Sequence, residues 1–449
     1  MSEFDVRGKR VTVAGAARSG IAASELLASQ GAIVTLSDTR TQVDEAERLR
    51  ALGVELELGG HKTETFSQAD LIVTSPGVPP EQPVLADARR RGIPVIGELE
   101  LASRWLRGRM VAITGTKGKS TTTELTGRIL EAAGYKVSVG GNIGSPLSAQ
   151  VAGSTADSIH VVEASSFQLE QIETFHPWIA VMLNFSPDHL DRHPNVEAYG
   201  AAKARIFENQ DTSDWMVVNA DDPEVLRLSQ KGRARTRFFS KDGAVTVGTV
   251  VEHGWIVDRS MKEDAKLVPL EAIHLLGPHL VNDVMAAAAV GTIAGAAPTA
   301  ITAAVESFPG LEHAMELVAD IGGVRFVNDS KATNVDAALH AIESFETGLV
   351  AIIGGKFKGG DLRLLREPLK KRARAVVAIG EATPLVKDAL AGAVDVREAA
   401  TLEDAVKQAF ALAKPQGVVL LAPACASFDM FRDYAERGRK FKEEVQKLR

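Results

Sequence analysis

The stretch of this sequence with the clearest chemical potential is Thr114-Gly-Thr-Lys-Gly-Lys-Ser-Thr121, between an apolar β-branched run and a segment of helical composition. Gly115 and Gly118 allow a tight turn whose backbone N–H groups point at one anion. Lys119 adds a mobile positive charge, and Ser120 places a hydroxyl where a phosphate-bound Mg²⁺ would sit. Such a loop at the start of a helix predicts a polyphosphate site.

The loop is shorter than the usual phosphate loop, because Ile113 stands where that spacing has a glycine. A strand–turn–helix junction without a ligand is the alternative. A second signal favours the nucleotide: the apolar strand predicted over residues 158–163 ends in Glu163. A carboxylate that closes a buried strand beside a phosphate loop is the expected Mg²⁺ ligand. The alternative role for Glu163 is a helix cap.

Two histidines and two aspartates follow the next predicted strand, over residues 178–183, within the six residues from Asp188 to His193. Their position at a strand end favours a metal or phosphate site over a plain polar loop, most of all for Asp188 and His189. The predicted helix from Tyr199 to Asn209 carries Lys203, which by itself reads as a surface lysine.

The N-terminal residues read as strand, glycine turn, helix and strand, the opening of a dinucleotide-binding fold. The turn is residues 15–20, and the second strand ends at Asp38. Ala17 replaces the glycine that lets the backbone meet a pyrophosphate, which disfavours NAD. Asp38-Thr39-Arg40 suits the base or phosphate of another nucleotide, and a solvated loop is the alternative. Ser75–Pro80 forms a rigid turn after a further strand.

From about Gly310, strands alternate with helices, and each strand runs into a polar loop. This order predicts a parallel sheet whose loops gather along one edge. Lysines, hydroxyls and amides in the loops suit a small anion, either an amino-acid carboxylate or a phosphate. Cys425 has no histidine nearby in sequence and reads as a buried thiol. The main loops are residues 329–334, 354–361 and 423–429.

Composition narrows the class of protein. A chain of 449 residues predicts two to four domains, and a net charge of −7 argues against a nucleic-acid binder. One cysteine excludes an internal disulfide, and the N-terminus has no secretory signal, so a cytoplasmic protein is expected. Val284–Val305 lacks charge, but its alanines and Pro298 favour two close-packed helices over a membrane span. Residues 235–275 predict a small antiparallel insertion.

The motifs together resemble a known family, the Mur ligases, which are ATP-dependent amide-forming enzymes of bacterial cell-wall synthesis. The resemblance runs over essentially the whole chain. Two motifs in the last third indicate the branch that adds D-glutamate to UDP-N-acetylmuramoyl-L-alanine. The motifs that carry the resemblance are residues 114–121, Glu163–Glu170, Asp188–Arg192, Asn219–Pro223, Asn328–Asn334 and Pro423–Asp429.

The resemblance implies an α/β fold of three domains. Residues 1–98 would form a Rossmann-like UDP-sugar-binding domain, and residues 99–309 a P-loop ATPase domain with a mostly parallel sheet. Residues 310–449 would form a Rossmann-like domain that binds the amino acid. ATP would phosphorylate the substrate carboxylate, and the amine of D-glutamate would displace phosphate. The expected partners are these substrates, without a membrane or nucleic acid, and the expected state is a monomer.

The resemblance also implies roles for single residues, with two Mg²⁺ ions and a carbamylated Lys203 that stabilises the second. The catalytic residues would be Lys119, Glu163, His189 and Lys203, and the metal residues Ser120, Glu163, His189 and Lys203. ATP would be bound by Gly115, Thr116, Lys117, Gly118, Lys119, Ser120, Thr121 and Asp329. The UDP-sugar would be bound by Ser19, Asp38, Thr39, Arg40, Gly77, Asn142 and Ser165. D-Glutamate would be bound by Lys331, Thr333, Lys358, Ser427 and Tyr434.

Some residues depart from the family pattern. Leu280 and Asp283 replace two asparagines near the adenine, and Ala314 replaces an arginine that faces phosphate. Lys117 stands where many relatives have asparagine, and Tyr434 where phenylalanine is common. These changes keep three alternatives open: a nucleotide-binding protein without turnover, a ligase for another amino acid and, disfavoured by Ala17, an NAD-dependent oxidoreductase. An assay with a panel of acceptors, and a nicotinamide titration, would distinguish them.

Overall fold

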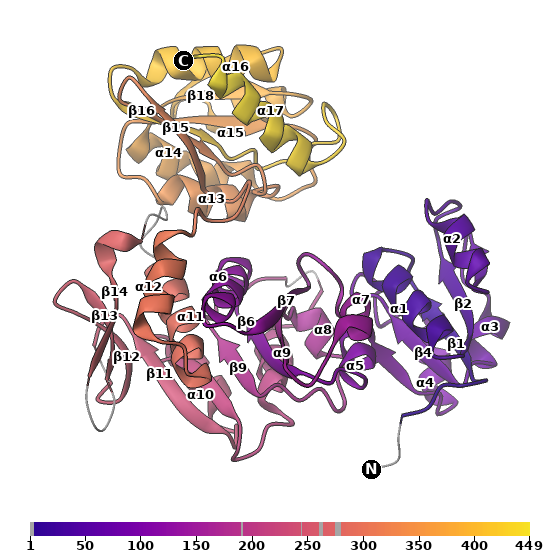
Figure 1. Ribbon diagram of the computed structural model, residues 1–449. Helices are drawn as coiled ribbons and strands as arrows, with labels where there is room; N and C mark the ends of the chain where they lie inside the picture. The colour runs from indigo at the N-terminus through magenta and orange to yellow at the C-terminus, as the bar shows by residue number, and fades with distance from the viewer. Residues whose placement is uncertain (1–3, 190–191, 244, 260–263, 274–279) are drawn as a thin grey trace. The chain divides into compact units, whose positions relative to one another are not determined.

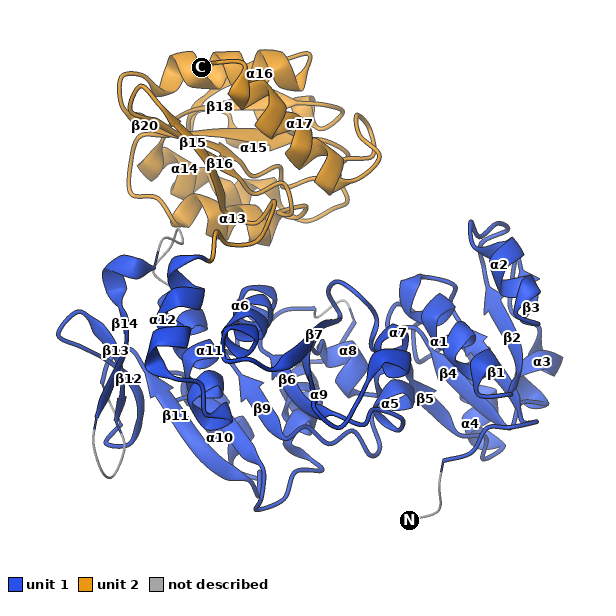
Figure 2. Cartoon of the chain, in the orientation of Figure 1, with its two compact units in different colours: residues 1–273, 281–307 blue, residues 274–280, 308–449 orange. Residues whose placement is uncertain are grey.

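The computed structural model describes residues 4–189, 192–243, 245–259, 264–273 and 280–449. The chain divides into two compact units, residues 1–273 with 281–307 and residues 274–280 with 308–449 (Figure 2). The first unit carries two sheets and the second unit one, and helices cover the sheet faces in the α/β manner (Figure 1). The Asp191 and His279 predictions lie outside the described residues.

The N-terminal sheet confirms the Rossmann-like prediction. Over the described residues it has five parallel strands in the order β3-β2-β1-β4-β5. Separate apolar clusters pack on its two faces, one around Val13 and Leu36 and the other around Ile72 and Leu85. The elements are β1 (Arg10–Ala14), α1 (Arg18–Ser29), β2 (Ile33–Asp38), α2 (Ala46–Ala51), β3 (Glu55–Leu58), α3 (Thr63–Ser67), β4 (Leu71–Thr74), α4 (Pro83–Arg90) and β5 (Val95–Gly97).

The central sheet orders nine strands in the described chain as β14-β13-β12-β11-β10-β9-β6-β8-β7. The segment from β7 to β12 is parallel, and only β13 and β14 run antiparallel to their neighbours. The strands are β6 (Arg109–Thr114), β7 (Lys136–Gly141), β8 (Ser158–Glu163), β9 (Ile179–Met182), β10 (Trp215–Asn219), β11 (Arg235–Ser240), β12 (Gly248–Glu252), β13 (Trp255–Arg259) and β14 (Ala265–Pro269).

The expectation of a separate antiparallel insertion over residues 235–275 is therefore wrong in part. β11 pairs in parallel with β10, and β12 with β11, so this region extends the main sheet. The hairpins β12–β13–β14 are antiparallel as expected. Turn signals and valines predict strands, but not which existing edge they join.

Helices of the central domain pack along this sheet (Figure 1). The alanine-rich stretch forms two helices that meet near Ala296, as predicted, and Ala286–Ala289 are fully buried. No helix among the described residues has both the length and the apolar character needed to cross a bilayer. The helices are α5 (Glu98–Ser103), α6 (Lys119–Ala132), α7 (Leu147–Gln150), α8 (Ser166–Leu169), α9 (Val196–Ala204), α10 (Pro223–Ser229), α11 (Leu280–Ala294) and α12 (Pro298–Glu306).

The C-terminal sheet has six strands in the described region, in the order β15-β16-β20-β17-β18-β19. All pairings are parallel except that of β15 with β16, so the predicted parallel series gains an antiparallel edge. The elements are β15 (Glu316–Ile321), β16 (Val324–Asn328), α13 (Val335–Glu343), β17 (Leu349–Gly354), α14 (Arg366–Arg372), β18 (Ala373–Ile379), α15 (Thr383–Leu390), β19 (Asp395–Ala399), α16 (Leu402–Ala413), β20 (Gly417–Leu421) and α17 (Tyr434–Gln446).

The segment expected to link the first two domains is buried. Helix α5 ends at Ser103, earlier than the Arg107 expected from sequence, and its Glu100 is fully buried. The Glu100 carboxylate accepts hydrogen bonds from the backbone N–H groups of residues 173, 174 and 175, from the Thr174 hydroxyl at 2.6 Å and from Arg104 Nε at 2.7 Å. A buried carboxylate with several donors ties α5 firmly to the central domain.

We expect Glu100→Leu to lower the free energy of unfolding by about 3–5 kcal/mol at neutral pH, because it leaves Arg104 and three amides unpaired. Burial raises the pKa of Glu100, but the hydrogen bonds from Thr174, Glu173 and Arg104 outweigh it and the pKa is lowered. The ionised group therefore stabilises the fold above the unfolded-state pKa of about 4.3 and loses this effect as pH falls through the folded-state value. Denaturant titrations at neutral and acidic pH should show the two proteins converging.

The matched control is Glu173→Gln, since Glu173 contacts the same Arg104 at 2.7 Å but is half-exposed. It should change stability by less than about 1 kcal/mol. Equal stability of Glu100→Leu and wild type would contradict the assigned role of Glu100.

Candidate functional site

The phosphate loop joins the end of β6 to the start of α6. Gly115 has φ 154° and Gly118 has φ 79°, both in the region that favours glycine. A Cβ on Gly118 would lie 2.1 Å from Asp283 Oδ1, so that position also lacks room for a side chain. Lys119 Nζ curls back and donates to the carbonyl oxygens of Gly115 at 3.1 Å and Thr116 at 2.8 Å. The loop thus holds its cation at the N-terminus of a helix, the arrangement that binds phosphates.

Asn184, just after β9, holds this loop in shape. Its Oδ1 accepts hydrogen bonds from the backbone N–H groups of Thr116 at 3.1 Å and Lys117 at 2.8 Å, and its Nδ2 donates to the Lys117 carbonyl at 3.0 Å. The Thr116 hydroxyl also exchanges hydrogen bonds with the backbone of Ser186. The loop is therefore joined to the segment that leads to Asp188 and His189.

Glu163 lies at the end of β8 and is 98% buried. Ser120 Oγ donates to its Oε2 at 2.6 Å, and Asn142 Nδ2 donates to its Oε1 at 2.8 Å. β8 and β6 are neighbouring parallel strands, which brings the strand end beside the loop. A hydroxyl and a carboxylate are the hard oxygen donors that Mg²⁺ prefers, so this donor set fits the predicted ion.

Lys203 is buried, not at the surface, and it reaches the phosphate loop. Its Nζ donates to the Gly115 carbonyl at 2.6 Å and lies 4.7 Å from the centre of the Tyr199 ring. Burial, and then the positive charge of Lys119, lower the pKa of Lys203 well below its usual value. Burial also raises the pKa of Tyr199 to about 12. The reading of Lys203 as a surface lysine is thus wrong.

His189 lies in the loop after β9 with its side chain half-exposed. Its φ of 54° is left-handed, a conformation uncommon for a residue with a side chain. The His189 ring packs 5.1 Å from Phe167 and 6.1 Å from Tyr199, the residue whose ring also contacts Lys203. The predicted metal residues therefore come from β8, α6, α9 and the loop after β9, all in the first unit.

Asp283, on α11, lies against the phosphate loop. It is 98% buried, its Oδ2 lacks a hydrogen-bond partner among the described residues, and burial raises its pKa well above the usual value. The structure thus places this departure from the family pattern at Gly118 and Thr122. A neutral carboxyl at this position has the shape and the donor capacity of an amide.

In the N-terminal domain, Asp38 is engaged with the protein backbone. Its carboxylate accepts hydrogen bonds from the N–H groups of Ala16 at 2.5 Å and Arg40 at 2.7 Å. These bonds close the first strand-to-helix turn onto the end of β2. Ser19 lies at the start of α1, and Arg18 Nη1 donates to the Gly144 carbonyl at 3.1 Å, two residues beyond Asn142. Thr39 and Gly77 are exposed beside the same sheet edge.

Ser165 lies between the two groups of residues, as the N-cap of α8. Its hydroxyl accepts from the Gln168 N–H at 3.3 Å and donates to the Gln168 side chain at 3.0 Å. This capping box fixes the turn that follows Glu163. Thr121 follows Ser120 in the first turn of α6.

In the C-terminal domain, three neighbouring parallel strands bring the predicted amino-acid ligands to one sheet edge. Lys331 and Thr333 follow β16, Ser427 follows β20, and Lys358 follows β17. Backbone hydrogen bonds link the loops: Ala424 N–H donates to Ala332 at 3.0 Å, and Lys356 and Ala426 exchange a pair of 2.8 and 3.0 Å. The expected gathering of polar loops is confirmed.

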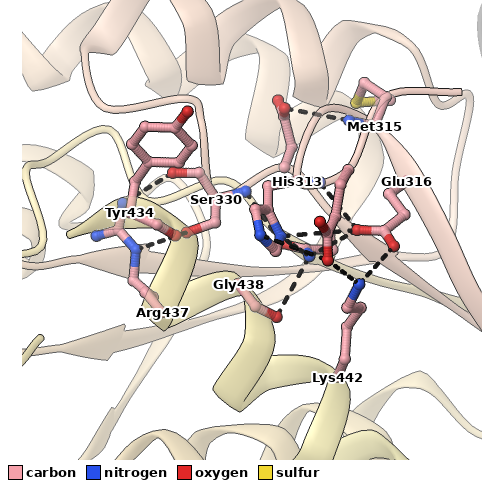
Figure 3. Close-up of polar contacts among 11 residues, drawn as sticks. His313, Met315, Glu316, Ser330, Tyr434, Arg437, Gly438 and Lys442 are labelled. Carbon is pink, nitrogen blue, oxygen red and sulfur yellow. Dashed lines mark hydrogen bonds and ion pairs between the residues drawn. The ribbon is translucent and has the colours of Figure 1, made fainter. Parts of the chain in front are cut away.

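Arg437 of α17 joins these loops from below and was missed in the sequence (Figure 3). It is 99% buried and donates to Ser330 Oγ and the Ser330 carbonyl, both at 2.9 Å, and to the Cys425 carbonyl at 3.1 Å. Burial lowers its pKa to about 10. A buried guanidinium that bonds two loops fixes their spacing. Cys425 is fully buried, and burial raises its pKa to about 11, in agreement with an inert thiol.

A second polar cluster supports the loop after β16 (Figure 3). Asn328 Nδ2 lies within hydrogen-bond distance of His313 Nδ1 and Glu316 Oε2, both at 3.0 Å. Asp329 accepts from the Met315 N–H at 3.2 Å, and burial raises its pKa to about 7. The Tyr434 ring is 41% exposed at the start of α17, 6.3 Å from His313. No sequence signal pointed to His313 as part of this support.

We expect Asn184→Ala to weaken ATP binding about tenfold, since it removes three hydrogen bonds that shape the loop, each worth about 1 kcal/mol at most in net terms. Isothermal titration with Mg²⁺ and a non-hydrolysable ATP analogue would measure this. Asn184→Asp keeps the acceptor oxygen for both N–H groups and should lose less. Unchanged binding by Asn184→Ala would contradict the role of Asn184.

Comparisons with known proteins agree with this architecture. Three family models match in order: "Mur ligase MurD-like, N-terminal domain" over residues 9–97, "Mur ligase middle domain" over 113–291 and "Mur ligase, glutamate ligase domain" over 313–425. A UDP-N-acetylmuramoylalanine–D-glutamate ligase of Koribacter versatilis is 47% identical over 99% of both chains. A relative of the same name from Acidobacterium capsulatum is 47% identical over 98% of this chain and 97% of its own.

Solved structures show the same fold at lower identity. A pseudomurein peptide ligase type C of Methanothermus fervidus has a TM-score of 0.60 at 20% identity and covers 98% of this chain and 100% of its own. The UDP-N-acetylmuramate-alanine ligase of Thermotoga maritima has a TM-score of 0.60 at 19% identity, with the same coverage. Together with the full-length relatives, these matches establish that the chain belongs to the Mur ligase family.

Proposed function

We propose that this protein is an ATP-dependent ligase that joins D-glutamate to UDP-N-acetylmuramoyl-L-alanine in the synthesis of a peptidoglycan precursor. The observation that carries the proposal is the 47% identity, over 99% of both chains, to a relative named for this reaction. The phosphate loop with Ser120 and Glu163, and the three polar loops of the second unit, supply the site residues that this reaction needs.

The reaction requires activation of a carboxylate, which is a poor acyl donor. Transfer of the γ-phosphoryl group of ATP to the carboxylate of UDP-N-acetylmuramoyl-L-alanine yields an acyl phosphate. The neutral amine of D-glutamate then attacks the acyl carbon, a tetrahedral intermediate forms, and inorganic phosphate leaves as the amide forms. The protein's part is to align the reactants and to neutralise charge.

The residues of the first unit divide these tasks. Lys119 and the N–H groups of residues 115–121 hold the β- and γ-phosphates, and Asp329 of the second unit belongs to the same ATP set. Ser120 and Glu163 hold one Mg²⁺, and His189 and Lys203 serve a second. The ions offset the phosphate charge when bound. The pairing of Ser120 with Glu163 at 2.6 Å supports the first assignment.

Carbamylation of Lys203 is part of the proposal. Addition of CO₂ to the neutral amine forms an N–C bond, releases one proton and turns the side chain into an anion. The burial of Lys203, its position beside Lys119 and its lowered pKa all favour the neutral amine. The carbamate oxygens would stabilise the metal that the ammonium would repel.

The other two ligand sets follow the same order. Ser19, Asp38, Thr39, Arg40, Gly77, Asn142 and Ser165 contact the UDP-sugar, and for Asp38 the bonds to Ala16 and Arg40 support an ordering role in the loop. Lys331, Thr333, Lys358, Ser427 and Tyr434 bind D-glutamate. Two lysines and two hydroxyls suit a ligand with two carboxylates.

We also propose domain boundaries at 98/99 and 309/310, supported by the family matches over 9–97, 113–291 and 313–425 and by three separate sheets. The protein acts as a monomer in the cytoplasm, where ATP is supplied. Asp283 and Ala314 favour one alternative, a family member that binds nucleotide without turnover.

Phosphate release distinguishes these functions. With Mg·ATP, we expect release only when UDP-N-acetylmuramoyl-L-alanine and D-glutamate are both present, because the amine consumes the acyl phosphate. A coupled phosphate assay, with mass spectrometry of the product, measures this. A panel of other amino acids in place of D-glutamate should give little release. No stimulation by the two substrates together would contradict the proposal and favour nucleotide binding alone.

Lys203→Ala is expected to lose about 100-fold or more in kcat, because the second metal loses an anionic neighbour. Added short carboxylates should restore part of the activity. The lowered pKa predicts that the amine is neutral near neutral pH and is protonated, and so unable to react with CO₂, as the pH falls.

A carbon-13 NMR signal from labelled bicarbonate should appear in the wild type and disappear in Lys203→Ala. Lys119→Ala serves as the control, since it should lose phosphoryl transfer without rescue by carboxylates. A fully active Lys203→Ala protein, or one without a carbamate signal in the wild type, would contradict the carbamate proposal.

A further inference from the structure

His193 is a fully enclosed histidine between two polar groups of helix α8. Its side chain has no exposed area; Nε2 lies 3.0 Å from Ser166 Oγ, and Nδ1 lies 3.1 Å from Glu170 Oε1. Ser166 and Glu170 stand at the two ends of α8, the short helix that follows Glu163. The histidine thus connects the loop of one predicted metal ligand with the strand end of another.

The order of serine, histidine and glutamate matches that of a hydrolytic triad, but the burial of these residues excludes such chemistry. Ser166 is 2% exposed and His193 is 1% exposed, so no substrate carbonyl can reach the hydroxyl. A nucleophile needs access to its acyl group. The three residues therefore act within the protein.

The backbone next to His193 holds His189 in its uncommon conformation. The His189 carbonyl accepts hydrogen bonds from the N–H groups of Arg192 at 3.0 Å and His193 at 2.9 Å, and His189 itself has φ 54°. A left-handed residue with a side chain persists only where its surroundings determine it. The anchored His193 is such a determinant, because its ring cannot shift without losing its contacts with α8.

The rings extend the same support to the His189 side chain. Phe167 stacks on His193 with centroids 5.4 Å apart at 19°, and it lies 5.1 Å from the His189 ring. Tyr199 contacts both histidines, at 5.1 Å from His193 and 6.1 Å from His189. Arg192 covers Phe167 at 5.1 Å. A rotation of His193 would therefore be felt at His189 through two packed rings.

We infer that His193, held by Ser166 and Glu170, is a positioning residue that sets His189 relative to Glu163 and thereby the affinity for the second divalent cation. The inference rests on the proposed function for the roles of His189 and Glu163. It goes beyond that function by assigning work to three side chains that touch neither substrate nor metal. Residues that orient a metal ligand typically affect metal affinity by about 10–100-fold when changed.

The test measures cation binding apart from catalysis. Mn²⁺ is titrated in the presence of a non-hydrolysable ATP analogue, and electron paramagnetic resonance counts bound ions. His193→Phe keeps the aromatic volume and the stack on Phe167 but removes both polar contacts. We expect its weaker Mn²⁺ site to lose about 10–100-fold in affinity, with the tighter site retained. In the phosphate assay, the Mg²⁺ concentration for half-maximal rate should rise by a similar factor, with little change in the KM for D-glutamate.

Further variants separate positioning from folding. Ser166→Ala and Glu170→Leu each remove one contact and should shift the same Mn²⁺ site, whereas Glu170→Gln keeps an acceptor oxygen and should remain within about threefold of wild type. In a double-mutant cycle, Ser166→Ala should add little to His193→Phe, because both remove one shared contact. Thermal melts establish that each variant is folded.

His176→Phe is the matched control. His176 pairs with Asp214 before β9, at the strand end opposite to the site, and its loss should leave Mn²⁺ binding unchanged. Unaltered Mn²⁺ affinity in folded His193→Phe, or additive losses in the cycle, would overturn the inference. A wild-type protein that shifts with these variants but releases no phosphate would retain the inference and contradict the proposed ligase.

Discussion

The carboxylate of Glu163 imposes the constraint on which the first unit depends. A buried charge is costly unless donors or cations surround it, and the described neighbours of Glu163 are Ser120 and Asn142. These contacts draw the phosphate loop and the turn after β7 to one strand end. The same neighbourhood contains two lysines, Lys119 and Lys203, that both donate to the Gly115 carbonyl. An anionic ligand with a divalent cation would satisfy this concentration of charge, which is the state the ligase reaction uses.

Parallel strands explain why the site residues meet. In both units the polar residues follow strands that lie side by side, β6, β8 and β9 in one and β16, β20 and β17 in the other. The carboxyl ends of such strands share one edge. Buried polar anchors then fix the loops at that edge: Asn184 for the phosphate loop, His193 for the metal loop and Arg437 for the amino-acid loops. Each anchor gains its rigidity from bonds to backbone groups or to a helix end, not from a surface ion pair.

The departures from the family pattern acquire a physical meaning in this context. Asp283 does not face solvent but lies against Gly118, where a charged form would be expensive and a neutral carboxyl resembles the amide it replaces. Lys117 presents its backbone to Asn184, so its side chain is not what holds the loop. At Ala314 the described residues show no feature that explains the lost arginine.

The sequence by itself determined the α/β class, the strand–loop–helix order at residues 109–132 and the strand ends that carry Glu163, His189 and Ser427. Glycine spacing, apolar runs and polar strand ends are local signals, and they persist in any arrangement of the chain. Only the tertiary structure decided that Lys203 is buried beside Gly115, that residues 235–275 extend the central sheet, and that Arg437 and His193 anchor distant loops. These facts depend on contacts between residues far apart in sequence, where burial, not residue type, decides whether a lysine is a solvated charge or a reactive amine.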